Sequence, residues 1–165
     1  ATTPALLRQA ALCSLHVAQH RAVANKLAGE EDKGGILVAA ASLVSGLSFG
    51  LARWYPSGLA GQIAVSFNCE YTRGCLYLNG VDAGDKVIIV DDLISTGGTM
   101  VSLVKAIRSV GADILDIVCV AEKIEYAGSR YVEDETGLKV SSLVQVSISS
   151  PRSKVVGVHP KLRLP

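Results

Sequence analysis

One segment restricts the fold more than any other: an apolar run leads directly into two carboxylates and then into a glycine-rich turn. Val87–Val90 is rich in β-branched residues, which is typical of a strand buried on both faces of a parallel sheet. Asp91 and Asp92 follow where that strand emerges. Ser95–Gly98 then provides small and hydroxyl-bearing residues before the helical pattern of Thr99–Val110. This order predicts an α/β fold, whose ligands bind beyond the carboxyl ends of the strands.

The remaining chain alternates strand and helix patterns, as expected for one domain over residues 1–165. Helices are predicted at Pro4–Ala28, in a short segment that follows a Ser/Gly-rich loop and stops before Pro56, and at Thr99–Val110, with a short polar helix or loop at Tyr126–Glu135. Strands are predicted at Ile36–Ala41, Gln62–Phe67, Cys75–Asn79, Lys86–Val90, Ile114–Ala121, Val140–Ser147 and Lys154–Val158. We expect a mostly parallel central sheet with helices on both faces, a Rossmann-like architecture.

Charge and aromatic content exclude two classes of nucleic-acid binder. Sixteen Lys and Arg residues oppose fifteen Asp and Glu residues, for a net charge of +1, so no strongly basic binding face is indicated. Aromatic residues make up only 5% of the chain, too few for a platform on which single-stranded bases stack. We therefore expect no nucleic-acid partner, and any anionic ligand must be held by local groups.

Three features favour a soluble, cytoplasmic protein without a membrane partner. The longest uncharged run, Gly34–Ala52, contains 7 Gly or Ser residues among 19, which argues against a transmembrane helix. The first residues lack the basic start and apolar core of a signal peptide. Four cysteines at irregular spacings indicate neither a zinc site nor a disulfide framework.

The turn after the predicted central strand has the chemistry of a phosphate site. The N-terminus of a helix offers unpaired N–H groups and a partial positive charge, and glycines allow the backbone to approach a phosphate closely. The adjoining carboxylates would repel a phosphate, so they must serve another part of the ligand. Vicinal ribose hydroxyls, bound directly or through Mg²⁺, are suitable partners. A phosphate at one end and a diol at the other would suit a ribose 5-phosphate.

The segment Val87–Met100 resembles the phosphoribosyl pyrophosphate-binding motif of type I phosphoribosyltransferases. The resemblance continues through Gly58–Ile63, Tyr71–Gly80, Gly111–Ile114 and Cys119–Lys123, and it is strong over residues 58–148, whereas residues 1–57 are divergent or shortened. The pattern is most similar to the archaeal-type purine (hypoxanthine/guanine) branch. It implies a Mg²⁺-dependent transfer of the phosphoribosyl group to a purine base, with hypoxanthine or guanine favoured and adenine possible. The products would be a nucleoside 5′-monophosphate and pyrophosphate, as in purine salvage, and the protein would be a homodimer.

The same resemblance assigns roles to individual residues. Asp91 and Asp92 would bind the ribose hydroxyls, and Mg²⁺ would be held by the substrate with help from these two carboxylates. The 5′-phosphate would be bound by Ser95, Thr96, Gly97, Gly98 and Thr99. The loop Asn68–Gly74 would be mobile and close over pyrophosphate, so its one cation, Arg73, is a candidate catalytic contact together with the two aspartates.

The base site is expected just after the predicted strand Ile114–Ala121, where Lys123 and Ile124 stand. Lys123 is able to donate a hydrogen bond to a 6-oxo group, which favours hypoxanthine or guanine over adenine.

The N-terminal half departs from the family pattern. Family members often carry an acidic residue and a glycine in the loop after the first core strand, where pyrophosphate and metal bind. With Ile36–Ala41 as that strand, the loop is Ala39–Leu43, which places Ala40 and Ala41 at phosphoribosyl pyrophosphate and contains neither residue type. A following strand with basic residues also looks reduced, with only Arg53 remaining.

These departures leave an alternative open: a non-catalytic regulatory domain that binds phosphoribosyl pyrophosphate without turning it over. Against this alternative, the sequence shows neither a helix-turn-helix segment nor a basic face for DNA. A serine hydrolase is a weaker alternative, because Gly46–Gly50 matches G-x-S-x-G but Pro56 leaves no room for the helix that must follow.

Overall fold

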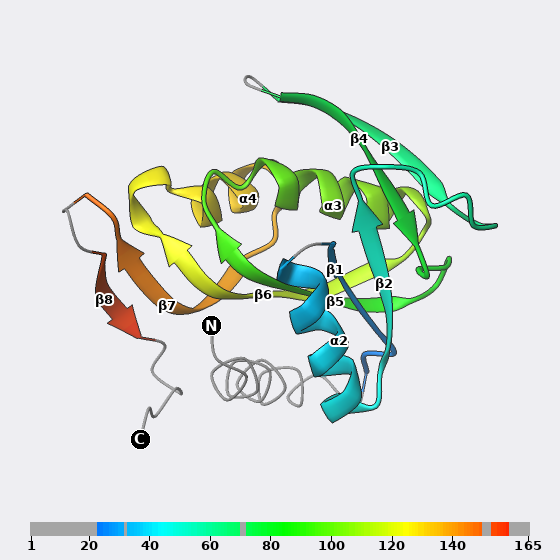
Figure 1. Cartoon of the computed structure of the whole chain (residues 1–165), viewed down its shortest axis with the longest axis horizontal. Coiled ribbons are helices and arrows are strands. Elements are labelled where there is room, and N and C mark those ends of the chain that lie inside the picture. The colour runs from blue at the N-terminus through cyan, green and yellow to red at the C-terminus, as the bar shows by residue number, and fades with distance from the viewer. Residues whose placement is uncertain (1–22, 32, 70–71, 150–152, 159–165) are drawn as a thin grey trace.

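A computed structural model describes residues 23–31, 33–69, 72–149 and 153–158. Its strands form one eight-stranded sheet in the order β3-β4-β2-β1-β5-β6-β7-β8 (Figure 1). The strands are β1 (Lys26–Glu30), β2 (Ser48–Arg53), β3 (Ile63–Cys69), β4 (Thr72–Asn79), β5 (Lys86–Ile94), β6 (Asp113–Lys123), β7 (Val140–Ser147) and β8 (Lys154–Val158). The helical elements are α2 (Lys33–Ser45), α3 (Gly98–Ser109), the 3₁₀ turn η1 (Ile124–Tyr126) and α4 (Gly128–Thr136).

The five central strands, in the sheet order β2-β1-β5-β6-β7, are parallel, and antiparallel strands flank them on both sides. Helix α2 covers one face of the sheet, and α3 and α4 lie on the other (Figure 1). The α/β architecture with a mostly parallel sheet, predicted from the sequence, is confirmed. Its carboxyl-end loops therefore meet along one edge, where a ligand site is expected.

The central strand β5 separates two hydrophobic cores. Val87 and Ile89 belong to the core beneath α3, whereas Ile88 and Val90 belong to the core beneath α2. All four side chains are fully buried. Alternate side chains of a strand point to opposite faces, so an uninterrupted apolar run is what a strand covered on both sides requires.

The predictions for residues 58 onward are largely confirmed. The strands β3 to β8, the helix α3 and its end at Gly111 lie where the patterns placed them, within a few residues. The polar segment from Tyr126 becomes η1 and α4, and α4 ends at Gly137, whose left-handed backbone (φ 74°) suits glycine.

In the first third of the chain, the helices and strands differ from those predicted. Lys26–Glu30 is the strand β1 rather than the end of a helix, and the rest of that predicted helix falls mostly on residues 1–22, which are outside the described part. Ile36–Ala41 lies inside α2 rather than in a strand. The expected loop and short helix before Pro56 are replaced by β2. The predicted first strand is in fact part of the helix that follows β1, because a short apolar run does not distinguish a buried helix from a buried strand.

No helix in the described ranges is long and apolar enough to cross a membrane. Of the cysteines whose side chains the structure describes, Cys75 is partly buried and Cys119 is buried, and the two do not form a disulfide.

Candidate active site

A cavity of about 150 Å³ opens at the carboxyl ends of β1 and β5. It is lined by Glu30, Asp91, Asp92, Leu93, Ile94, Ser95, Thr96, Gly97, Gly98, Thr99 and Met100. The two aspartates and all five residues predicted for a phosphate loop are therefore brought together in one place. Hereafter Ser95–Thr99 is called the phosphate loop.

The phosphate loop ends in the N-terminus of α3, which borders the cavity. Gly97 is the N-cap residue and has φ 84°, a left-handed conformation that explains the need for glycine. No side chain caps this helix end. The first N–H groups of a helix have no partner within the helix, and here they face a cavity. The loop has no charged side chain, so these amides and the adjoining hydroxyls are what it offers an anion.

The Asp91 and Asp92 carboxylates stand beside the phosphate loop. The Asp92 amide donates a hydrogen bond to Asp91 Oδ1 (2.8 Å). Burial raises the pKa of Asp91 from its ordinary value of 3.8 to about 7, and the charges of Asp92 and Glu30 act in the same direction, against the Asp92 amide, which lowers it. The site thus holds a carboxyl group that titrates near neutral pH.

These carboxylates offer oxygen ligands of the kind that Mg²⁺ prefers. Among the described residues, no three His, Cys, Asp or Glu side chains are placed to hold a metal ion by themselves. Mg²⁺ commonly uses one or two carboxylates together with substrate phosphates, and the donor set here fits that mode of binding.

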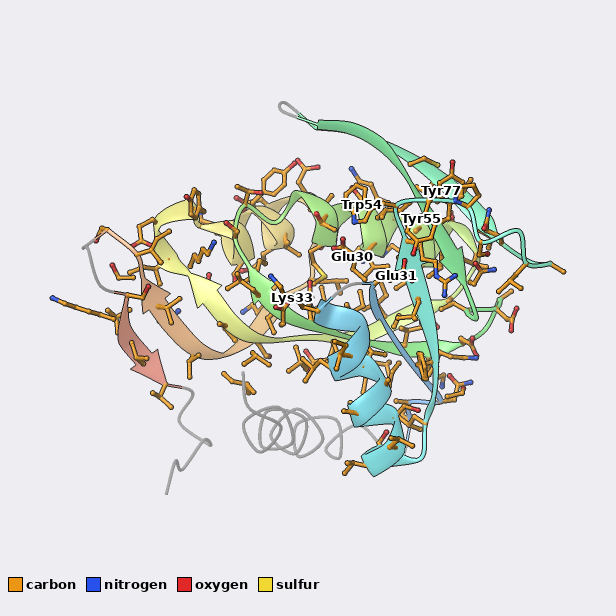
Figure 2. All side chains as sticks on the ribbon, viewed as in Figure 1. Glu30, Glu31, Lys33, Trp54, Tyr55 and Tyr77 are labelled. Carbon is orange, nitrogen blue, oxygen red and sulfur yellow. The ribbon has the colours of Figure 1, made fainter. Side chains whose placement is uncertain are left out.

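A second loop reaches the cavity from β1. Glu30 lines the cavity and accepts a hydrogen bond from Trp54 Nε1, while Glu31 Oε1 lies 3.3 Å from Arg53 Nε (Figure 2). The Tyr55 hydroxyl also bonds to Glu31, which raises the pKa of Tyr55. The end of β2 therefore holds both acidic residues at the end of β1.

The start of α2 lies against the same aspartate. A Cβ atom at Gly34 would be only 2.7 Å from Asp91 Oδ1, so glycine allows the helix N-terminus to approach this carboxylate. Lys33 is the exposed first residue of α2 (Figure 2).

This arrangement overturns the expectation for Ala39–Leu43. The first core strand is β1, which is followed by Glu31 and, in the first turn of α2, by Gly34. This segment therefore contains the acidic residue and the glycine of the family pattern. Ala40 and Ala41 lie in the interior of α2, where Ala41 is buried in the core and Ala40 packs against it. Their prediction as binding residues is wrong, because the first core strand is β1 and Ile36–Ala41 belongs to α2.

Arg73 lies in β4, where its backbone pairs with Asn68 of β3. The predicted loop Asn68–Gly74 is shorter than expected, since β3 continues to Cys69 and β4 begins at Thr72. The contact of Arg73 with pyrophosphate stays a prediction.

The predicted base residues lie at the end of β6, next to β5. Lys123 is the last residue of the strand, Ile124 begins η1, and Lys123 Nζ lies 6.0 Å from the centre of the Tyr126 ring. Neighbouring positions pair with the β5 end, as Glu122 does with Ile94. These residues stand near the phosphate loop, outside the residues that line the cavity, and their role stays a prediction.

Ser48 is not placed as a nucleophile. It begins β2, and its Oγ donates to the Asn25 carbonyl oxygen (3.5 Å). A nucleophile elbow joins a strand to a following helix, whereas Ser48 is preceded by a helix and followed by a strand.

Comparisons with known proteins agree with this geometry. The phosphoribosyl transferase domain family matches residues 39–154. Two archaeal proteins named hypoxanthine/guanine phosphoribosyltransferase are similar over most of their length. The one from Methanocaldococcus jannaschii is 40% identical over 145 residues (88% of this chain, 78% of that protein). The one from Methanothermobacter thermautotrophicus is 39% identical over 154 residues (93% and 78%).

Solved structures show the same fold. The adenine phosphoribosyltransferase of Thermoanaerobacter pseudethanolicus superposes with a TM-score of 0.70 at 25% identity, covering 82% of this chain and 80% of that one. The enzyme from Leishmania tarentolae gives a TM-score of 0.76 at 15% identity, covering 87% and 72%. A match over most of the sequence, together with relatives near 40% identity, establishes that this chain belongs to the phosphoribosyl transferase domain family.

Proposed function

We propose that this protein is a purine phosphoribosyltransferase that transfers the 5-phosphoribosyl group from phosphoribosyl pyrophosphate to a purine base. The observation that carries the proposal is one cavity that combines an uncapped helix N-terminus with a pair of aspartates. The first feature suits the 5′-phosphate and the second suits the ribose hydroxyls.

In the proposed reaction, a purine nitrogen attacks the anomeric carbon. The bond from that carbon to pyrophosphate breaks, its electron pair leaves with pyrophosphate, and the purine N–H proton is released. The protein contributes mainly by positioning the reactants and by stabilising charge. Asp91 and Asp92 would accept hydrogen bonds from the ribose hydroxyls, and the phosphate loop would hold the 5′-phosphate.

Pyrophosphate would lie against the β1–α2 loop. Lys33 supplies a cation there, at the N-terminus of α2, and Gly34 brings that terminus close to Asp91. Mg²⁺, when bound with the substrate, would neutralise charge that develops on the leaving pyrophosphate. Asp91 and Asp92 are the residues that would help to hold it.

We propose hypoxanthine and guanine as the bases. The archaeal relatives at 39–40% identity carry that name, whereas the two solved structures named adenine phosphoribosyltransferase are less similar in sequence, at 15–25% identity. Lys123, at the end of β6, is a hydrogen-bond donor suited to a 6-oxo group and not to a 6-amino group.

The alternative of a non-catalytic regulatory domain loses its main support. That alternative depends on the absence of an acidic residue and a glycine after the first core strand, but β1 is followed by Glu31 and, in the first turn of α2, by Gly34. Turnover is therefore the better-supported proposal.

The test is pyrophosphate release from phosphoribosyl pyrophosphate and Mg²⁺ with hypoxanthine, guanine, adenine or no base. We expect release with the two 6-oxopurines. Asp92→Asn should lower kcat/KM about 10–100-fold, the loss expected when a hydrogen bond to a charged group is removed. Asp113→Asn, an exposed carboxylate at the other end of β6, is the matched control and should retain activity. Binding of the donor without release from any base would support the regulatory domain instead.

We also propose that the protein forms a homodimer, as the family resemblance implies. Helix α2 has no charged residue after Lys33, and it exposes Ile36, Leu43 and Val44 by 56%, 87% and 62%. An apolar helix face of this kind is typical of an interface. Light scattering should give twice the 17.2 kDa mass of the chain, and Leu43→Lys should shift the protein toward the monomer. A monomeric wild-type protein would contradict this proposal.

A further inference from the structure

The first residue of α4 touches the backbone of the phosphate loop. A Cβ atom at Gly128 would lie 2.0 Å from the Ser95 carbonyl oxygen, 2.9 Å from the Ser95 carbonyl carbon and 3.0 Å from the Gly97 nitrogen. Gly128 is buried, and only a hydrogen atom fits at this position. The loop backbone therefore rests directly on the start of α4.

The contact is reciprocal. A Cβ atom at Gly97 would lie 2.7 Å from the Gly128 carbonyl oxygen, 3.1 Å from Val132 Cγ2 and 3.2 Å from Tyr131 Cδ1. Two backbones approach each other because glycine stands on both sides. The first turn of α4 thus packs against the phosphate loop, and no residue of α4 lines the cavity.

The segment that contains Gly128 is held in place by contacts with the rest of the fold. Val132 of α4 is fully buried in the core beneath α3. The preceding turn η1 is tied to the end of β7, because Glu125 Oε1 accepts hydrogen bonds from Ser147 Oγ (2.6 Å) and the Ile148 amide (2.8 Å). Between η1 and α4, Ala127 has φ 50°, the one positive φ outside glycine in the described part of the chain. This left-handed residue turns the chain so that Gly128 meets the loop.

A supported loop matters because of how it binds phosphate. The phosphate loop has no lysine or arginine, so recognition depends on where the N–H groups of Gly97, Gly98 and Thr99 point. A displacement of about 1 Å in such a group is enough to lose much of the binding to the phosphate. We propose that Gly128 is a positioning residue that fixes the phosphate loop for recognition of the 5′-phosphate. This inference rests on the proposed function of the same cavity.

The test compares two glycine substitutions in α4. Gly128→Ala adds one methyl group against Ser95 and Gly97, at a helical position that alanine otherwise favours. Gly137→Ala is the matched control: it lies at the far end of α4, has φ 74°, and a Cβ atom there would meet nothing within 4 Å. It strains the helix end without touching the loop. Each variant is assayed for thermal stability, for the Kd of ribose 5-phosphate by calorimetry, and for kcat and KM with phosphoribosyl pyrophosphate.

We expect Gly128→Ala to raise both the Kd of ribose 5-phosphate and the KM of phosphoribosyl pyrophosphate at least tenfold, with kcat at saturation within about threefold of wild type. Gly137→Ala should lower stability and leave both constants within twofold. A merely structural role of Gly128 would reduce the active fraction and therefore kcat, with unchanged KM. Equal effects of the two substitutions on Kd, or no effect of Gly128→Ala, would overturn the proposal.

Tyr131→Ala provides a second variant if Gly128→Ala does not fold. It removes a side chain that contacts Gly97 and is 40% exposed, so the fold should tolerate the change. A rise of the Kd by threefold or more supports the positioning role, and an unchanged Kd contradicts it.

Wild-type protein that binds ribose 5-phosphate but releases no pyrophosphate with any base would refute the proposed reaction alone. Wild-type protein that does not bind ribose 5-phosphate would refute both.

Discussion

At the scale of single residues, Asp91 controls how the site responds to pH. Its carboxyl group has a pKa of about 7 because burial disfavours the charged form, and because the negative charges of Asp92 and Glu30 do the same. Near neutral pH the group is therefore present in both protonation states. Since only the ionised carboxylate accepts hydrogen bonds at both oxygens, the binding of ribose hydroxyls should depend on this titration.

We predict that kcat/KM for phosphoribosyl pyrophosphate rises with pH through a midpoint near 7, because kcat/KM reports the ionisation of the free enzyme. Glu30→Gln removes one of the charges that raise the pKa of Asp91 and should shift the midpoint to lower pH. Glu135→Gln, which removes a charge paired with Lys105 away from the cavity, is the control and should leave the midpoint in place. Coincident profiles for wild type and Glu30→Gln would refute this explanation.

The raised pKa of Asp91 also predicts how the free energy of unfolding depends on pH. Because the pKa of Asp91 is raised in the folded protein, the folded state binds this proton more tightly than the unfolded state. The resulting stabilisation is present below about pH 4 and is lost as the pH rises toward 7. Each pKa unit corresponds to about 1.4 kcal/mol, so the change amounts to a few kcal/mol at most. Asp91→Asn should flatten this part of the profile in urea denaturation between pH 4 and pH 7, and an unaltered slope would count against it.

At the scale of secondary-structure elements, the site is where two helix N-termini meet the carboxyl ends of two strands. Helix α3 follows β5 through the phosphate loop, and α2 follows β1 through the loop that leads to Lys33. Gly34 permits the close approach of α2 to the Asp91 carboxylate. The distance between α2 and β5 at this point therefore determines the shape of the cavity.

We predict that Gly34→Ala lowers kcat/KM by about tenfold or more, because a Cβ atom 2.7 Å from Asp91 Oδ1 must displace either the carboxylate or the helix. Gly35→Ala is the matched control in the same turn. Its Cβ atom would meet its nearest neighbour, the Glu30 carbonyl oxygen, at 3.5 Å, an ordinary contact. Steady-state kinetics of both variants check the prediction, which fails if the two substitutions have equal effects.

At the scale of the whole molecule, one sheet separates two hydrophobic cores, which have no residue in common among the described residues. Leu103 of α3 lies in the core on one face, and Ile88 of β5 lies in the core on the other. Both side chains are fully buried. The site at the edge of the sheet depends on both cores, because each supports one of the two helices that border it.

We predict that Leu103→Ala and Ile88→Ala each reduce the free energy of unfolding by about 2–5 kcal/mol, through lost burial and the cavity left behind. The two losses should add to within about 0.5 kcal/mol in the double variant, since the residues pack in separate cores. Urea denaturation of the four proteins provides the comparison. A coupling energy above about 1 kcal/mol would show that the two cores act as one.

The phosphate loop and the two aspartates were predictable because strand, turn and helix N-terminus are contiguous in the chain. Val87–Val90, the two aspartates and the start of α3 follow one another directly along the chain, so a pattern of neighbouring residues is enough to predict them. The second half of the site was not predictable in the same way. Helix α2 is apolar around its whole circumference, so its periodicity gave no sign of a helix, and Ile36–Ala41 was assigned to a strand.

The sequence by itself thus determined the mostly parallel α/β class, the two-sided burial of the central strand and the phosphate loop with its carboxylates, because each depends on neighbouring residues. Only the tertiary structure decided which loop faces Asp91, that Trp54 holds Glu30 at the cavity, and that Gly128 supports Ser95. These contacts join segments more than twenty residues apart, such as Glu30 and Trp54. Their geometry is determined by how the strands pair and how the helices pack, and no local pattern in the chain records it.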